Sequence, residues 1–174
     1  MPWGWVVLAG RRWLTPQTGP LSAALMQDSS GTLRWVSGSD VFRAASESRA
    51  VWAFQSYPAV IGNDSVLAPL RAAGRGVDLA HRDARAGVCI TRDNRLLVAI
   101  TRFDAAGPSL GFVPFGLTVP EMTAVLGSLG CRNAMLLDGG ISVKLRVRDA
   151  RGVVHDWDGL RPVPLALVAL PRQH

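Results

Sequence analysis

The sequence of 174 residues has few of the patterns that identify common classes of protein. Its three histidines are scattered, and no cysteine and histidine cluster has the spacing of a zinc site. The apolar run at residues 163–170 is far too short to span a bilayer and contains a proline, so we expect no transmembrane helix. No basic head followed by a long apolar stretch opens the sequence, which therefore shows no signal peptide. Repeats and low-complexity segments are also missing, which argues against a repeat array.

Cysteine is scarce, since Cys89 and Cys131 are the only two in the chain. Both lie in apolar contexts at or just before predicted strands, where buried free thiols are common. A disulfide would form only if the sheet brought the two residues together. We therefore expect free thiols.

Lysine is almost absent, so the net charge of +6 is carried by arginine, with Lys144 as the exception. The planar guanidinium suits phosphate and carboxylate groups, which fits an anionic substrate or a polyanionic surface. Scattered arginines are equally typical of a solvated surface. Nucleic acid binding would need a clustered basic stripe with interleaved aromatic residues. The tryptophans instead gather in the N-terminal third, where they suit core packing, so we expect no nucleic acid partner.

Length and a hydrophobic content of 48% predict a single domain with a substantial core. Strand patterns are found at residues 4–8, 23–27, 32–36, 52–55, 86–91, 96–101, 134–137, 143–147 and 165–170. Turn residues between them predict hairpin links at 29–31, 92–95 and 149–152. Helices are predicted at 40–48 and 119–129. Because strands dominate, we predict an α+β fold with twisted mixed β-sheets and few flanking helices.

The most informative motif is Asp138-Gly139-Gly140-Ile141-Ser142, which follows a short apolar strand. It delivers a carboxylate and a hydroxyl onto a backbone with two successive positions that lack a Cβ, which allows a ligand or another strand to approach. Asp-Gly is also a common hairpin signal, so a plain tight turn is the alternative.

The segment before this motif predicts a helix with defined ends. Thr118 and Glu121 have the spacing of a capping box, and Pro120 is tolerated so early in a helix. Gly130 is expected to end the helix in a left-handed conformation. Capping accounts for Glu121 without any role in chemistry.

Three blocks in register resemble the phosphodiester glycosidase domain, also called the NAGPA or DUF2233 domain. The blocks are residues 116–142, an arginine-headed strand, turn and strand at 85–98, and a Gln-Ser-x-Pro type segment at 55–60. Cys89 and Ile141 depart from the family, which usually has glycine there. The family normally opens with a strand and an Asn-Gly-Gly-Phe type segment, so we expect residues 1–174 to be an N-terminally shortened domain of this type.

The resemblance implies a hydrolase that cleaves a sugar-1-phosphodiester, of the N-acetylglucosamine-1-phosphodiester type, in glycans or cell-envelope polymers. Such a reaction needs a cation for the phosphate, an acid or base, and donors that orient the sugar. Arg85 would grip the phosphate, and Asp138 would act as the acid/base or orient the sugar. Substrate-binding contacts would come from backbone amides and polar side chains, namely those of Gly139, Gly140, Ser142 and Gln55.

Each of these residues also has a structural interpretation. Arg85 suits a strand-end surface position, Gln55 a sheet edge and Ser142 a turn. His81 is a candidate acid/base or a surface loop histidine. The alternative function is a non-catalytic domain that binds an anionic glycan, or a pseudoenzyme.

The sequence identifies no cofactor and no metal site. A calcium ion near Asp138 would need six or more oxygen ligands, and one loop carboxylate falls far short of that number. The resemblance implies a periplasmic or extracellular location.

Overall fold

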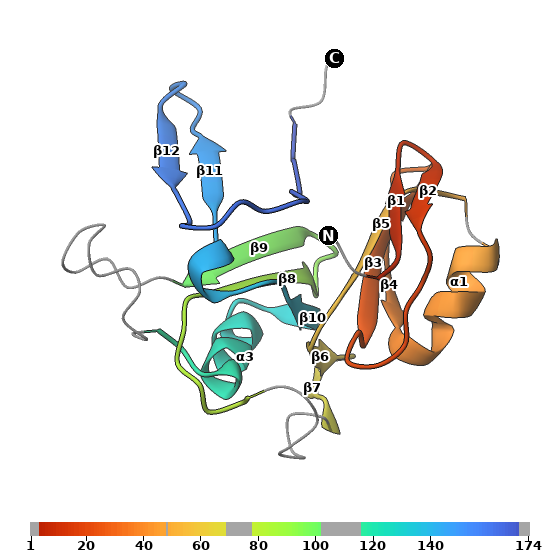
Figure 1. Ribbon diagram of the computed structural model, residues 1–174, viewed down its shortest axis with the longest axis horizontal. Helices are drawn as coiled ribbons and strands as arrows, with labels where there is room; N and C mark the ends of the chain where they lie inside the picture. Colours follow the sequence, from red (N-terminus) through yellow and green to blue (C-terminus); the bar gives the residue numbers. More distant parts are fainter. Residues whose placement is uncertain (1–3, 48, 69–77, 102–115, 171–174) are drawn as a thin grey trace.

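The computed structural model describes residues 4–47, 49–68, 78–101 and 116–170. These residues form two five-stranded sheets and a separate two-stranded hairpin (Figure 1). The predicted α+β class, with twisted sheets and few flanking helices, is confirmed. Within the described part of the chain, no helix is long and apolar enough to cross a membrane.

The first sheet has the strand order β2-β1-β5-β3-β4, and its neighbouring strands pair antiparallel. Its members are β1 (Val6–Leu8), β2 (Arg11–Leu14), β3 (Ala23–Asp28), β4 (Leu33–Ser37) and β5 (Ala50–Ser56). A 3-10 turn, η1 (Gly38–Asp40), leads into helix α1 (Val41–Glu47), which buries Val41 and Ala45 against this sheet.

The second sheet has the order β7-β6-β10-β8-β9 and is also paired antiparallel. Its members are β6 (Ala59–Gly62), β7 (Ser65–Val66), β8 (Arg85–Thr91), β9 (Leu96–Thr101) and β10 (Cys131–Leu136). Helix α3 (Val119–Ser128) packs on it, and the chain then continues through η3 (Gly140–Ser142) to the hairpin of β11 (Leu145–Arg148) and β12 (Val154–Trp157).

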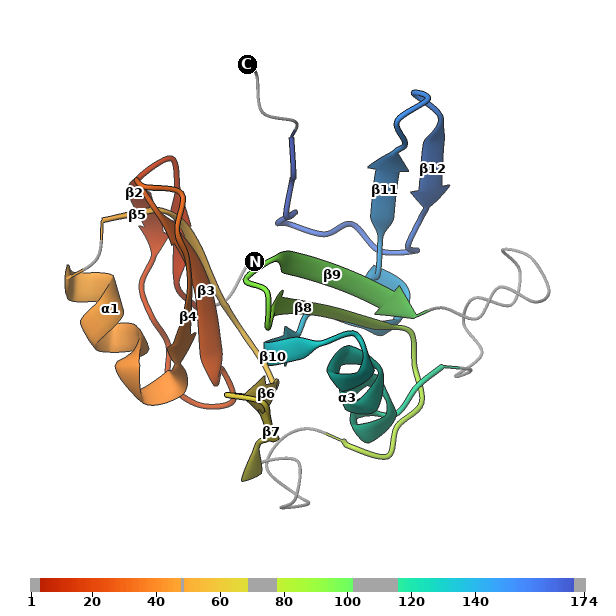
Figure 2. The ribbon, with the colours of Figure 1, turned by 180° about the vertical axis from the view of Figure 1, so that it is seen from behind.

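The two sheets face each other between the two helices, so the fold has four layers in the order α1, first sheet, second sheet and α3 (Figures 1 and 2). Alternation along β3 creates this arrangement because Ala24 and Met26 face α1, whereas Ala23 and Leu25 face the second sheet. The core between the sheets also contains buried residues of β6, β8 and β10, namely Ala59, Val88, Ile90 and Met135.

Helix α3 begins and ends where the sequence predicted. The Thr118 side chain accepts from the Glu121 N–H, and the Glu121 carboxylate accepts from the Thr118 N–H at 2.8 Å, which completes the capping box. Gly130 follows the helix with a φ of +84°, a conformation that only glycine adopts without strain.

The prediction of free thiols is wrong, because Cys89 and Cys131 form a disulfide. The two residues belong to β8 and β10, which are neighbours in the second sheet, and their Cα atoms are 5.7 Å apart. The pairing of these strands is non-local, so the sequence left the approach of the two cysteines open. The disulfide is buried under α3 and fixes β10 to β8.

The strand predicted at residues 165–170 is also wrong, since this segment is exposed and pairs with no described strand. Its apolar side chains suit a strand, but a strand forms only where an edge is available for hydrogen bonding. Sequence reasoning missed the short or polar strands β2, β6, β7 and β12. The three predicted hairpin links are confirmed, because they join β3 to β4, β8 to β9 and β11 to β12.

Candidate functional site

The three sequence blocks meet at one end of the second sheet. The Ser56 hydroxyl at the end of β5 donates to the Leu136 carbonyl at 2.8 Å. Directly after β10, the Leu137 N–H donates to the Ala86 carbonyl at 2.8 Å. The antiparallel pairing of β10 with β8 therefore places the residues that follow Leu137 beside the first residue of β8, Arg85.

The two glycines of the motif are required for different reasons, Gly139 by the close approach of the Ala84 backbone and Gly140 by its left-handed conformation. A Cβ on Gly139 would lie 2.9 Å from the Ala84 carbonyl oxygen, and a Cβ on Gly140 would lie 2.6 Å from Oδ2 of Asp83. Gly140 also has a φ of +59°. The motif is thus a close packing of two backbone segments at the sheet end and does not connect two hairpin strands.

The two glycine amides differ in availability. The Gly140 N–H donates to the Ala84 carbonyl at 2.8 Å and is therefore occupied. The Gly139 N–H has no acceptor among the described residues. Within the described ranges, one of the two predicted backbone donors is therefore without an acceptor.

Backbone carbonyls of two other segments hold the Arg85 side chain. Its Nε donates to the Leu117 carbonyl at 2.9 Å, and one terminal nitrogen donates to the His81 carbonyl. The other terminal nitrogen lies 4.0 Å from the position of a Cβ on Gly139. Arg85 is half-buried and oriented, and its guanidinium makes no ion pair with any described residue. Such a cation is suited to hold a phosphate.

Asp138 and Ser142 occupy different environments in the same segment. Asp138 is exposed, and its carboxylate accepts no hydrogen bond from the described residues. Ser142 is 7% exposed, and its N–H donates to the Gly139 carbonyl at 3.2 Å, which stabilises the turn. No described residue therefore occupies the Asp138 carboxylate, and a contact between the buried Ser142 and substrate stays a prediction.

Gln55 lies at the end of β5, and its amide group already has protein partners. Its carbonyl oxygen accepts from the backbone N–H groups of Trp5 and Gln17, and its nitrogen donates to the carbonyls of Gln17 and Leu21. These bonds attach the residue before β1 and the segment after β2 to the end of β5. A contact between Gln55 and substrate stays a prediction, and it would require some of these bonds to break.

The loop before β8 is fixed to helix α3, which determines where its charged residues lie. Asp83 and Leu117 exchange backbone hydrogen bonds. Arg82 forms an ion pair of 2.6 Å with Glu121, the capping residue of α3. The Thr118 N–H and Arg82 together lower the pKa of Glu121. Glu121 therefore caps the helix, as predicted, and also holds the loop.

Sequence reasoning missed Asp83, which is a second carboxylate at the site. Its Oδ1 accepts from the Ala84 N–H at 2.8 Å, and its Oδ2 lies against Gly140 and 3.7 Å from Nε2 of His81. In sequence, this residue belongs to a short run of charged residues that is typical of a surface loop. The two glycines facing it were the only signal that another segment approached closely. Within the described ranges, no group of three or more potential ligand residues is arranged to hold a metal.

Comparison with solved structures shows the class of fold. The catalytic domain of zebrafish N-acetylglucosamine-1-phosphodiester α-N-acetylglucosaminidase, auto-inhibited by its pro-peptide, matches with a TM-score of 0.60 and 16% identity. The match covers 82% of this chain and 47% of that one, so this chain spans about half the length of the solved zebrafish chain. A hypothetical protein from Synechocystis matches with a TM-score of 0.45 and 23% identity, over 65% of this chain and 19% of that chain.

The sequence profile of the phosphodiester glycosidase (NAGPA) family matches residues 2–170. The chain belongs to this family, as its sequence resemblance implied. No curated protein gives a significant match.

Proposed function

We propose that the protein is a hydrolase that cleaves a sugar-1-phosphodiester, of the N-acetylglucosamine-1-phosphodiester type, in glycans or cell-envelope polymers. Family membership supports the reaction class. The observation that carries the proposal is the oriented guanidinium of Arg85, which lies beside Gly139. Among the described residues, the guanidinium has no carboxylate partner and the Gly139 N–H has no acceptor. A site argument is needed because a fold alone does not determine function.

Arg85 and the Gly139 N–H act on the phosphate. When the bond between the sugar C1 and the phosphate oxygen breaks, negative charge develops on the departing phosphomonoester. A fixed cation and a fixed N–H donor stabilise that charge without reorganisation, which lowers the barrier. The two carbonyls that hold Arg85 keep its terminal nitrogens oriented before substrate arrives.

Asp138 serves as the general base. Water attacks the sugar C1, its proton passes to the Asp138 carboxylate, and the electron pair of the broken bond leaves with the phosphomonoester. The carboxylate is exposed and accepts no hydrogen bond in the described part of the structure, so it is free to accept this proton. The glycines allow the substrate to approach the backbone beside it.

The test is hydrolysis of methyl N-acetylglucosamine-1-phosphodiester in ¹⁸O-labelled water, with mass spectrometry of both products. The proposal predicts free N-acetylglucosamine that carries ¹⁸O at C1 and an unlabelled methyl phosphate. Label in the phosphate would mean cleavage of the phosphorus–oxygen bond and would contradict the proposal. Binding of the substrate by calorimetry without turnover would favour the alternative, a non-catalytic domain that binds anionic glycans.

A further inference from the structure

The segment that follows the β11–β12 hairpin exposes a run of apolar side chains. The N–H groups of residues 160–161 donate to the Ile141 carbonyl, which ties the start of the segment to η3. From there to residue 170 every residue is exposed, with Val168 at 69% and Leu170 at 81%. Residues 163–170 make no backbone hydrogen bond with another described residue. A long apolar run whose backbone is unpaired is typical of a surface that meets another protein.

The sequence of this segment suits a strand that is buried on both faces. Side chains alternate along a strand, so Leu165 and Leu167 would share one face, and Val168 and Leu170 the other. Strands that are apolar on both faces occur where both faces are covered. The segment therefore fits a sheet edge that has apolar residues on both sides.

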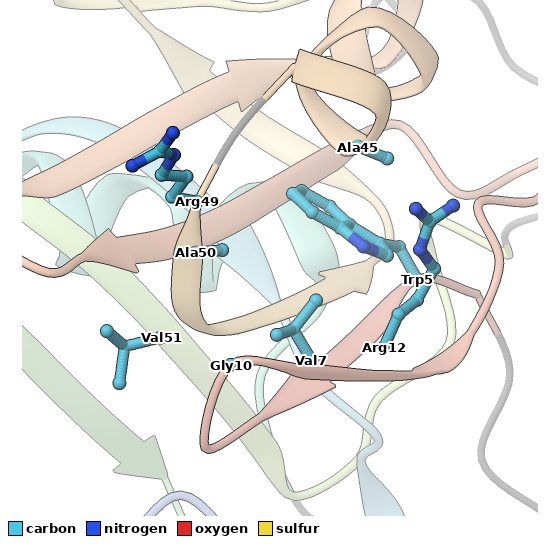
Figure 3. Close-up of a pocket in the computed structure, with 8 residues that line it drawn as sticks. All are labelled: Trp5, Val7, Gly10, Arg12, Ala45, Arg49, Ala50 and Val51. Atoms are coloured by element: carbon cyan, nitrogen blue, oxygen red, sulfur yellow. The ribbon is translucent and has the colours of Figure 1, made fainter.

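The first sheet offers no such edge. Its outer strands, β2 and β4, carry arginine, and three of the four residues of β2 are exposed. A hollow of about 320 Å³ lies beside α1, but it has no strand edge, and Val7 and Ala45 in its wall are already buried (Figure 3). Figure 3 shows Trp5 between these two residues, and all three belong to one core cluster.

Strand β9 of the second sheet is the edge that matches. It has β8 on one side and no described strand on the other. Residues 96–100 are all apolar, and Val98 is 44% exposed. Leu97 and Ala99 pack with the cluster beneath α3, whereas Leu96 packs with the cluster between the sheets. A strand added beside β9 would therefore have apolar neighbours on both of its faces.

The pairing of β9 with β8 determines which backbone groups of β9 are unpaired. The Ala86 carbonyl accepts from the Leu137 N–H, so Ala86 turns its backbone groups away from β9. Ile100 lies opposite Ala86 and therefore turns its own groups away from β8. The same alternation applies to Leu96 and Val98. The N–H and carbonyl groups of these residues thus form a template for a further strand.

We propose that residues 163–170 add to β9 of a second copy of this chain, and that two copies exchange their segments reciprocally. The exchange covers both apolar segments and both open edges, so it closes as a symmetric dimer. Within one chain the segment rises away from the second sheet, which places it to reach a neighbour (Figures 1 and 2). Neither element contains a residue of the candidate site, so this proposal does not depend on the proposed hydrolase function.

The test combines sedimentation equilibrium with amide hydrogen exchange of the full chain, from about 1 μM to about 1 mM. We expect twice the monomer mass at high concentration. Protection of the Leu96, Val98 and Ile100 amides should increase together with the dimer fraction, because these groups lack a partner in the single chain.

Three outcomes would overturn the proposal. The first is a monomer at all concentrations. The second is a dimer without added protection in β9, because another surface would then form the contact. The third is protection of the β9 amides in the monomer, which would mean that the segment pairs with β9 of its own chain.

Matched variants separate strand addition from general apolar adhesion. Leu167→Asp places a charge in a segment that becomes buried, and Val98→Pro removes an outward N–H from an edge strand, where proline is tolerated. Trp13→Ser is the control, because it removes a side chain that is 60% exposed on β2. We expect the first two variants to weaken dimerisation about tenfold or more and the control to leave it unchanged.

Circular dichroism is the folding control for these variants. Leu167 is exposed and lies outside the described helices and strands, so its variant is expected to fold. Equal weakening by all three variants would contradict the proposal, as would undiminished dimerisation of Leu167→Asp.

Discussion

The two sheets of this fold differ in how firmly their parts are fixed. Helix α3 on the second sheet buries four residues, has a complete capping box and ends at a left-handed glycine. A buried disulfide joins the two central strands beneath it. Helix α1 on the first sheet is seven residues long and buries two. The first half has a hollow beneath its helix, whereas the second half carries the candidate site.

This difference follows what each half has to do. A site that orients a guanidinium, a carboxylate and a backbone amide needs rigid supporting elements. Here Arg85 and Asp138 lie at the ends of two strands that the disulfide and α3 hold in register. The comparison predicts that substitutions that destabilise the second half also disturb the candidate site, and that substitutions that destabilise the first half do not.

The largest effect is expected for Asp138→Asn. The amide is nearly isosteric and cannot accept a proton, so kcat should fall by about 10²–10⁴-fold while the fold is preserved. Initial rates of N-acetylglucosamine release measure the effect, and circular dichroism is the folding control. Asp93→Asn changes a carboxylate in the turn between β8 and β9, at the other end of β8 from Arg85, and it should leave kcat unchanged. Equal activity in Asp138→Asn and wild type would remove Asp138 from the reaction.

Removal of the disulfide should lower the stability of the second half more than that of the first half. Opening a link between residues 42 positions apart should lower the free energy of unfolding by about 4 kcal/mol. Amide hydrogen exchange of the Cys89→Ala/Cys131→Ala variant should show the loss of protection mainly in β8 and β10, with β3 and β5 less affected. A uniform loss over both sheets would mean that the domain has no weaker and stronger half. Wild type with its disulfide reduced keeps both sulfur atoms, so it controls for the side-chain volume that the alanine variant loses.

Gly130→Val tests the end of α3. A β-branched residue at a φ of +84° should cost about 1–2 kcal/mol through left-handed strain. Gly127→Ala is the matched control within the same helix, because its Cβ would meet only ordinary contact, 3.9 Å from Ile61. That control should be neutral or slightly stabilising. A thermal melt of Gly130→Val equal to wild type would mean that the helix ends elsewhere.

The smallest effect concerns pH and Glu121. The Thr118 N–H and Arg82 lower the pKa of this carboxylate below its ordinary value of 4.5, so its contribution to stability is present above that value. The contribution is lost as the pH falls through the lowered pKa. Glu121→Gln keeps a capping acceptor but loses the charge. The stability difference between wild type and variant, from urea melts, should therefore shrink below about pH 4.5, and a difference that grows there would contradict the assignment.

Local signals allowed the sequence to predict much of this fold. The capping box, Gly130 and the three hairpin links depend on residues a few positions apart, and all were predicted. The disulfide and the segment at 165–170 depend on which strands become neighbours, and both predictions were wrong. The strand β2 was missed because it is short, mostly exposed and has no alternation of polar and apolar residues.

The site shows the same division between local and non-local information. Sequence reasoning selected Arg85 and the Asp138 segment, and the structure places their backbones side by side. It could not reveal that carbonyls of His81 and Leu117 orient the guanidinium, because these contacts depend on how the loop before β8 packs on α3. Asp83 was missed for the same reason.

The central claim is that Arg85 holds the phosphate in the site where Asp138 acts. Calorimetry with methyl N-acetylglucosamine-1-phosphodiester tests it directly, with the Asp138→Asn protein binding the uncleaved substrate. Adding Arg85→Lys to that variant keeps the charge but loses the planar contact, so affinity should fall about tenfold. Adding Arg92→Lys, at the opposite end of β8, should leave affinity unchanged. Equal affinity with and without the Arg85 substitution would contradict the claim.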